Sequence, residues 1–119
     1  MVWSIIKDRP ICPQIVEQLC VRIAAGDFKP NERLLSVRDV ALEAGVNPNT
    51  VQKSFEQLES QGLIYSVRGS GWYVGENLSA AQAVAAELRR NKTASFIQEM
   101  KTLGTGLNEI KEMIKEWEE

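Results

Sequence analysis

Apolar residues recur with the three- and four-residue spacing of an amphipathic helix in three consecutive segments of the chain. The segments are residues 13–25, 36–44 and 48–61, and a glycine follows each of them. Glycine readily takes the left-handed conformation that ends a helix. The pattern therefore predicts three short helices, each with one buried face.

The second and third of these helices have clear start signals. Ser36 stands three residues before Asp39, which is the spacing of a capping box. Asn47 is a candidate N-cap, and Pro48 suits the first position of the helix that follows. The connection between the two helices is short, so we expect a helix-turn-helix.

A β-hairpin is predicted directly after the third helix. Residues 63–68 and 72–74 are rich in β-branched and aromatic side chains, and Gly69, Ser70 and Gly71 form a turn between them. Two helices, a tight turn and a hairpin with a glycine-rich tip describe a winged helix-turn-helix, which places one helix in a DNA groove. The predicted fold is mainly α with a small β-hairpin wing.

The composition changes from residue 79 onward. Residues 79–90 read as an Ala-rich helix that carries Val84 and Leu88 and that Ser79 could cap. Beyond it, apolar residues follow the heptad a/d spacing, a pattern that needs a partner helix. We expect residues 1–75 to form the DNA-binding domain and 76–119 a two-helix tail that pairs two copies of the chain. Gly104 and Gly106 interrupt the stripe, which leaves open a kink or a break. The residues expected at the dimer interface are Val84 and Leu88 of the Ala-rich helix and, in the stripe, Phe96, Met100, Leu103, Leu107, Ile110, Ile114 and Trp117.

The totals exclude several classes of protein. The chain of 119 residues is 44% apolar, as in globular proteins, and shows neither a secretory signal nor a membrane-length apolar run, so we expect a cytoplasmic protein. It has no histidine, which removes the commonest general base and metal ligand. Cys12 and Cys20 would lie about 12 Å apart on one helix, too far for a disulfide. We expect no enzyme, no metal and no cofactor.

The net charge of −2 is unusual for a DNA-binding protein. Basic and acidic residues are equal in number between residues 1 and 75. If the chain binds DNA, its positive charge must be local, and its affinity for non-specific DNA should be weak and sensitive to salt.

The first turns of the third helix are predicted to read bases. Asn and Gln side chains can pair with adenine, and Lys suits guanine or a phosphate. The alternative is that Asn47 and Thr50 only cap the helix and that the others are solvated; for Asn47 we favour the cap. The candidate residues are Asn47, Asn49, Thr50, Gln52 and Lys53.

Three arginines are further candidates. Arg38 lies in the first turn of the second helix, where a phosphate contact competes with an ion pair to Glu43. Arg68 precedes the wing turn, and with Gly69 beside it the backbone could approach the minor groove. Arg33 is equally consistent with a DNA contact and with a surface position.

The residues resemble a known family over positions 10–75. The runs I-A-A-G-D-F-K-P-N-E-R-L-L-S-V-R-D-V-A, G-V-N-P-N-T-V, L-E-S-Q-G-L-I and R-G-S-G-W-Y-V are similar to the N-terminal domain of GntR-family bacterial transcription regulators. The resemblance implies a winged helix-turn-helix that binds palindromic operators as a dimer. It also implies that the family's DNA contacts fall on Arg38, Thr50, Arg68 and Gly69.

Two features place the resemblance within the family. The short tail and N-P-N-T-V are similar to the YtrA-like subfamily, whose members commonly repress operons for ABC transporters, often including their own gene. Leu35 replaces the family's usual proline, and Pro48 and Gln52 occupy positions that are often arginine. These departures imply a different half-site.

The expected function is that of a homodimeric, sequence-specific regulator of double-stranded DNA, most simply a repressor. The alternative is a winged-helix module that binds proteins without specific DNA binding. No group of residues marks a pocket for a small-molecule effector.

Overall fold

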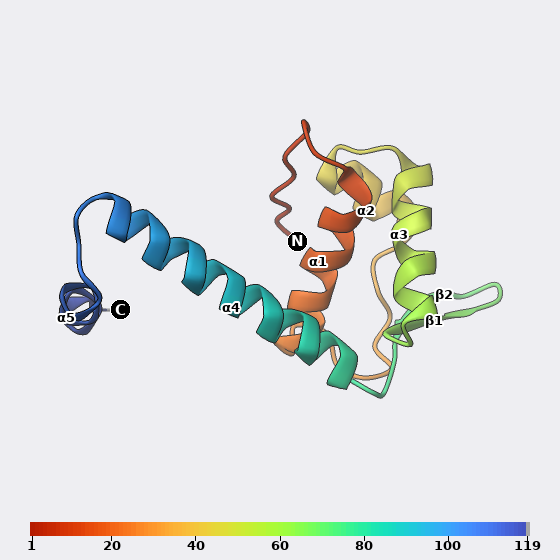
Figure 1. Cartoon of the computed structure of the whole chain (residues 1–119). Coiled ribbons are helices and arrows are strands. Elements are labelled where there is room, and N and C mark those ends of the chain that lie inside the picture. Colours follow the sequence, from red (N-terminus) through yellow and green to blue (C-terminus); the bar gives the residue numbers. More distant parts are fainter. Residues whose placement is uncertain (119) are drawn as a thin grey trace. The chain divides into compact units, whose positions relative to one another are not determined.

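The computed structural model describes residues 1–118. Its elements, in chain order, are α1 (Ile11–Ala24), α2 (Val37–Ala44), α3 (Pro48–Ser60), β1 (Ile64–Val67), β2 (Gly71–Val74), α4 (Ser79–Thr102) and α5 (Leu107–Glu116) (Figure 1). The chain divides into two compact units, of which the first is Met1–Ala85 and the second begins at Ala86. The mainly helical fold with a hairpin wing is confirmed. The first turns of α4 lie in the first unit, beyond the boundary expected at residue 75.

The helix starts form as the sequence predicts. Ser36 Oγ accepts a hydrogen bond of 3.0 Å from the backbone N–H of Asp39, and Asn47 Oδ1 accepts one of 2.8 Å from Asn49. Pro48 is the first residue of α3. These caps satisfy N–H groups that have no partner inside the helix. α1 begins at Ile11, two residues before the predicted start.

The core of the first unit is built around α3. Val51, Phe55 and Leu58 are fully buried, as the apolar pattern predicts, and α3 packs against α1, α2 and β1. Ser54 is also buried, and its hydroxyl donates to the Thr50 carbonyl at 2.8 Å, so its polar atom is satisfied. The inward face of α3 fixes its direction and leaves its opposite face to solvent.

The wing is a two-stranded antiparallel hairpin in which Tyr65 pairs with Tyr73. A third extended segment, missed by the sequence pattern, lies beside β2. The Leu34 N–H donates to the Trp72 carbonyl at 2.8 Å, and Arg33 forms a β-bridge with Tyr73. The wing therefore continues into the connection between α1 and α2.

Residues before α1 form a strap along that helix. Gln18 exchanges two hydrogen bonds with the backbone of Ser4, and Gln14 exchanges two with the backbone of Ile6. Lys7 Nζ then donates to the Gly45 carbonyl at 2.8 Å, where α2 ends. The backbone N–H and C=O groups of Ser4 and Ile6 thus bond to glutamine side chains, where in a sheet they would bond to a neighbouring strand.

The start of α4 belongs to the winged-helix unit. Ser79 is the first helical residue rather than the cap; Asn77 Oδ1 accepts from the Ser79 N–H at 3.0 Å and thus performs the capping. Ala81 and Ala85 are buried, and Val84 is half-buried against the core of this unit. Val84, expected at a dimer interface, therefore makes contacts within its own chain.

The predicted heptad seam does not form as one helix. α4 continues past Arg90 to Thr102 and ends in a Schellman motif, in which Thr105 N–H bonds to the Met100 carbonyl and Gly104 N–H to that of Lys101. Gly104 has a φ of +88°, a left-handed conformation that other residues rarely adopt. The structure therefore shows a break at the glycines where the sequence left open a kink or a break.

The stripe residues are thus divided between two helices, and Trp117 lies just after α5. Ile110 is buried, and Met100 and Leu88 are half-buried. Most of the others are exposed: Leu103 by 78% and Trp117 by 79%. We call residues 86–118 the tail.

No helix in the described part of the chain is long and apolar enough to span a membrane.

The two thiols lie in different environments on α1. Both cysteines are free, as expected from their spacing; Cys12 is half-buried and Cys20 fully buried. Burial, together with the carboxylate of Glu17, raises the pKa of the Cys20 thiol to about 11. A thiol reacts as its thiolate, so both burial and the raised pKa protect Cys20.

We expect a thiol reagent such as Ellman's reagent at pH 8 to modify Cys12 well before Cys20 in the folded protein. The thiolate fraction of Cys20 should stay small until the pH approaches 11. The two rates can be separated with the variants Cys12→Ala and Cys20→Ala, and both thiols should react at once in denaturant. Equal rates in the folded protein would contradict this assignment of burial.

Candidate nucleic-acid interface

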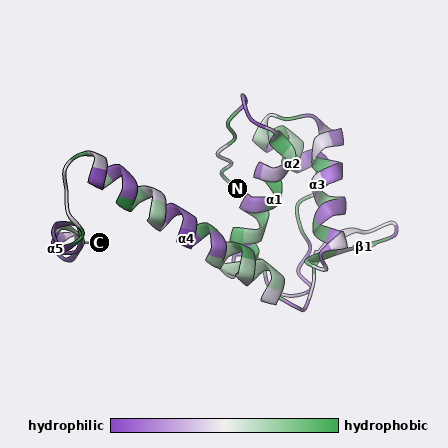
Figure 2. Ribbon diagram, in the orientation of Figure 1, coloured by the Kyte–Doolittle hydropathy of each residue, from purple (hydrophilic) through white to green (hydrophobic). Residues whose placement is uncertain are grey.

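The outer face of α3 presents a row of polar side chains. Asn49, Gln52, Lys53 and Glu56 are exposed on the side opposite the buried stripe. Figure 2 shows hydrophilic residues along the length of this helix, while its buried apolar residues belong to the face that packs against α1, α2 and β1. Because one face is fixed in the core, the polar face projects as a rigid surface.

The predicted residues at the start of α3 differ in their freedom. Asn47 uses its side-chain oxygen to cap the helix, the role favoured from the sequence. Thr50 is half-buried, so only part of its side chain faces solvent. Asn49 is exposed, and only its backbone N–H takes part in the cap. Its side-chain amide therefore remains free.

Gln52 has a partner on its own helix. Its Nε2 donates to Glu56 Oε1 at 3.3 Å, one turn further along α3. A bidentate contact with adenine uses both the oxygen and the nitrogen of the amide. The amide nitrogen carries two hydrogens, so the bond to Glu56 leaves one N–H for a base acceptor, and Gln52 Oε1 can accept from a base donor.

Arg38 lies in the first turn of α2 and is exposed. The ion pair with Glu43, the alternative to a phosphate contact, is not formed. Glu43 Oε1 lies instead 3.3 Å from the amino group of Met1. The Arg38 guanidinium remains available to an external anion.

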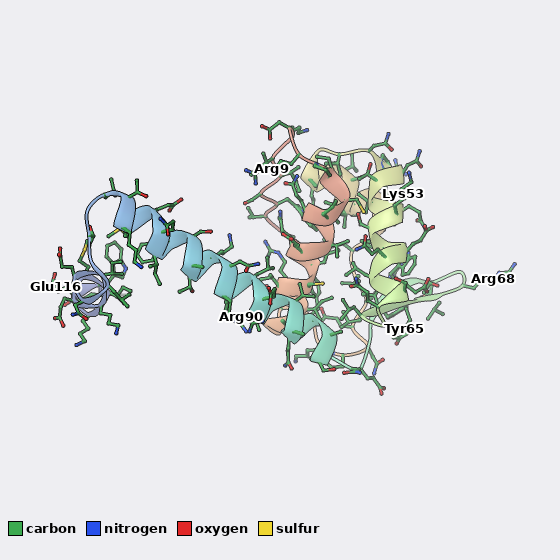
Figure 3. All side chains as sticks on the ribbon, in the orientation of Figure 1. Arg9, Lys53, Tyr65, Arg68, Arg90 and Glu116 are labelled. Carbon is green, nitrogen blue, oxygen red and sulfur yellow. The ribbon has the colours of Figure 1, made fainter. Side chains whose placement is uncertain are left out.

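The wing carries one exposed cation close to its tip. Arg68 follows β1, and Figure 3 shows its side chain pointing away from the rest of the wing. The turn is closed by a hydrogen bond of 2.9 Å from Ser70 N–H to the Val67 carbonyl, and nothing lies near Gly69. This arrangement lets both the side chain and the backbone approach a large ligand.

Arg33 is placed differently from the other candidates. Its Nη2 donates to the Ser70 carbonyl at 2.7 Å, so its side chain reaches the turn of the wing. No pattern in the sequence predicted this contact. The nearest hint is the alternation of Arg33 with the buried Leu34, which is typical of a strand beside a sheet.

The electrostatics of the surface suit a polyanion. In the described residues, no carboxylate is within ion-pair distance of Arg38, Lys53 or Arg68, all of which are exposed. Figure 3 shows Lys53 and Arg68 projecting outward from α3 and from the wing. The part of the chain that the structure describes holds no group of His, Cys, Asp or Glu residues suited to a metal ion.

A recognition helix with a polar outer face, a preceding helix with a free arginine in its first turn and a wing with an exposed arginine define a winged helix-turn-helix DNA-binding protein. Residues 13–74 match the model of the bacterial regulatory proteins of the gntR family. The match covers more than half of the chain. The chain therefore belongs to the GntR family of transcriptional regulators and is not an enzyme.

Known relatives resemble the chain beyond the DNA-binding domain. The HTH-type transcriptional repressor YtrA of Bacillus subtilis is 34% identical over 90% of this chain and 83% of its own length. A GntR family transcriptional regulator from Listeria monocytogenes superposes with a TM-score of 0.76 at 33% identity, covering 96% of this chain and all of that one. The DNA-binding domain of AraR, solved with operator ORE1, matches 63% of this chain and 94% of its own with a TM-score of 0.55 and 27% identity.

Replacing Gln52 with Ala should reduce affinity for a DNA site selected by the wild-type protein by about 1–3 kcal/mol if Gln52 reads a base. Fluorescence anisotropy titrations can measure the loss. Gln61→Ala, at the opposite end of α3, is the matched control and should leave the affinity unchanged. Equal affinities for wild type and Gln52→Ala would assign Gln52 to the solvated surface.

Proposed function

We propose that the chain is a homodimeric repressor that binds a two-fold symmetric operator. The observation that carries the proposal is the set of three exposed cations, on α2, α3 and the wing, that have no described carboxylate partner. They accompany the polar face of a rigid recognition helix. YtrA, which the chain resembles over most of its length, is named as a repressor, and AraR binds operator DNA.

Each part of the surface has its own task in the proposed complex. Arg38 and Lys53 contact backbone phosphates. Phosphate contacts fix the position of a protein on the duplex and carry no direct sequence information. Asn49, Thr50 and Gln52 read base edges in the major groove. The wing brings Arg68 and Gly69 to the adjacent minor groove or backbone.

The exposed apolar surface of the tail supports pairing of two chains. Phe96, Leu103, Leu107 and Ile114 are each more than two-fifths exposed in the single chain, although they are large and apolar. Exposed apolar patches of this kind mark interaction surfaces. We propose that the second copy of the chain covers this surface, with both α4 and α5 contributing rather than one continuous coiled coil.

Pairing also addresses the weak charge of the domain. A single DNA-binding domain, called a head here, offers few cations. Its affinity for non-specific DNA depends mainly on contacts between cations and phosphates. Joining two heads makes the second half-site contact intramolecular, which raises the overall affinity without new contacts on either head. A symmetric dimer in turn selects a symmetric operator.

DNase I footprinting on DNA upstream of the chain's own gene tests the specificity and the proposed autoregulation. We expect a protected, two-fold symmetric site with half-site centres about 10 bp apart at ~100 mM salt. Resemblance to the YtrA-like subfamily suggests that the operon encodes an ABC transporter and the regulator itself. Absent or sequence-independent binding would refute the repressor and favour a winged-helix module that binds proteins.

The double variant Leu103→Glu and Ile114→Glu tests the tail as a dimer interface. Both residues are exposed in the single chain, so the folded protomer should tolerate the substitutions, whereas a dimer would have to bury the new charges. Sedimentation analysis should show a monomer. A binding titration should show that its affinity for the operator is reduced at least tenfold. Asn108→Glu, exposed on α5, is the control, and a double variant that remains dimeric would contradict the interface.

A further inference from the structure

The side chain of Arg33 connects the strand-like segment before α2 to the turn of the wing. Its backbone forms the β-bridge with Tyr73, and its Nη2 donates to the Ser70 carbonyl at 2.7 Å. Arg33 thereby reaches from the body of the domain to the residue next to Gly69. It has no carboxylate partner among the described residues that would draw it elsewhere.

The guanidinium group occupies the space beside Gly71. A Cβ placed on Gly71 would lie 3.3 Å from Arg33 Nε, which is tighter than ordinary contact, and 3.5 Å from Nη2, which is an ordinary van der Waals distance. Gly71 also has a φ of +137°, in the region that favours glycine. The absence of a side chain at Gly71 therefore creates the seat in which Arg33 rests.

Other polar contacts join the same face of the wing. The hydroxyl groups of Ser70 and Tyr73 form a hydrogen bond, and the Tyr73 ring stacks on Tyr65 with centroids 5.7 Å apart. The Tyr65 hydroxyl in turn donates to Asn31 Oδ1 at 2.8 Å. These contacts run from the base of the hairpin to its turn, and Arg33 makes the one that involves the turn backbone.

A wing of this size needs such support to hold its tip. Each strand has four residues, and a two-stranded hairpin of that kind is marginally stable alone. The opposite face is anchored by Trp72 against Phe55, but Trp72 pairs with Ser66, on the base side of the Val67–Gly71 pair next to the turn. Beyond these pairs, the Arg33 contact fixes the turn to the domain.

We propose that Arg33 is a positioning residue, which holds the wing turn in place so that Arg68 and Gly69 meet the DNA together with α3. The inference rests on the proposed function, since it assigns the task of one residue within the same surface. It separates Arg33 from Arg38, Lys53 and Arg68, whose side chains are free for direct contact. In this assignment the guanidinium of Arg33 is committed to Ser70 and Gly71.

The test compares Arg33→Met, which keeps most of the length but removes the donors and the charge, with Arg68→Ala and with the double variant. Arg9→Met removes an equal charge from the segment before α1 and serves as the control. Two measurements are made on the full-length chain. The first is the ¹⁵N order parameter of the amides of Gly69 and Ser70 without DNA, and the second is affinity for DNA selected by the wild type.

If Arg33 positions the wing, Arg33→Met should lower the order parameters of the turn from about 0.85 toward 0.6 or below without DNA. Its affinity loss should be about tenfold, similar to that of Arg68→Ala, and the double variant should bind no worse than about twofold below Arg68→Ala. Arg9→Met should change neither measurement. The non-additivity shows that Arg33 acts through Arg68 and its neighbours.

Three results would overturn the inference. An ordered turn in Arg33→Met would show that the contact with Ser70 does not hold the wing. Affinity losses that multiply in the double variant, together with a log–log salt slope of the double variant about 0.9 shallower than that of Arg68→Ala, would make Arg33 an independent DNA contact. An unchanged affinity would remove Arg33 from DNA binding. A wild type that selects no DNA sequence would instead refute the proposed function, a result distinct from these three.

Discussion

The contact between Phe55 and Trp72 is the interaction on which the DNA-binding surface depends. Phe55 lies on the buried face of α3, and Trp72 belongs to β2; their rings meet edge to face with centroids 5.5 Å apart. Aromatic pairs of this geometry combine a large buried area with a preferred orientation. The contact fixes the wing to the recognition helix, so the polar side chains of both elements can address one duplex as a single rigid body. Without this contact, the wing and the recognition helix would be free to move relative to each other. Ordering them on DNA would then reduce the free energy of binding.

The two faces of the wing are stabilised by different chemistry. The inner face is apolar and is held by Trp72, while the outer face is held by stacked tyrosines and by hydrogen bonds that end at the turn. The aromatic contact lies on the base side of the turn, whereas hydrogen bonds to the turn set its position within a few tenths of an ångström. A short wing can therefore present an exposed arginine without a large sheet behind it. The strap before α1 follows a similar principle, since glutamine side chains take the place of a neighbouring strand.

The low charge of the domain connects the DNA-binding surface to the tail. A protein with a formal net charge of −2 gains little from general attraction to DNA, so its affinity has to come from a few well-placed contacts and from their repetition. The exposed apolar residues of the tail offer a surface for that repetition in the proposed dimer. α4 is continuous from Ser79 to Thr102, with Ala81 and Ala85 buried in the winged-helix unit and its later turns in the tail.

Much of the winged-helix unit could be predicted from the sequence, because its signals are local. Caps at Ser36 and Asn47, glycines after the helices and the buried positions of α3 depend on neighbours within a few residues, and the structure confirms them. The cations on α2, α3 and the wing are likewise found by their places in these elements, and their contacts with DNA stay predictions.

Contacts between distant residues were decided by the tertiary structure. The seat of Arg33 at Gly71 and the burial of Val84 against the winged-helix core depend on where whole elements come to lie. The sequence left open whether the heptad stripe from Phe96 to Trp117 is kinked or broken at Gly104 and Gly106, and the left-handed turn at Gly104 ends α4 there. The sequence by itself thus determined the helices, their caps and the polar reading face, since hydrophobic spacing and backbone preference act locally. Which side chains are free for DNA and which support the wing followed only from packing, since it brings together residues that are remote in the chain.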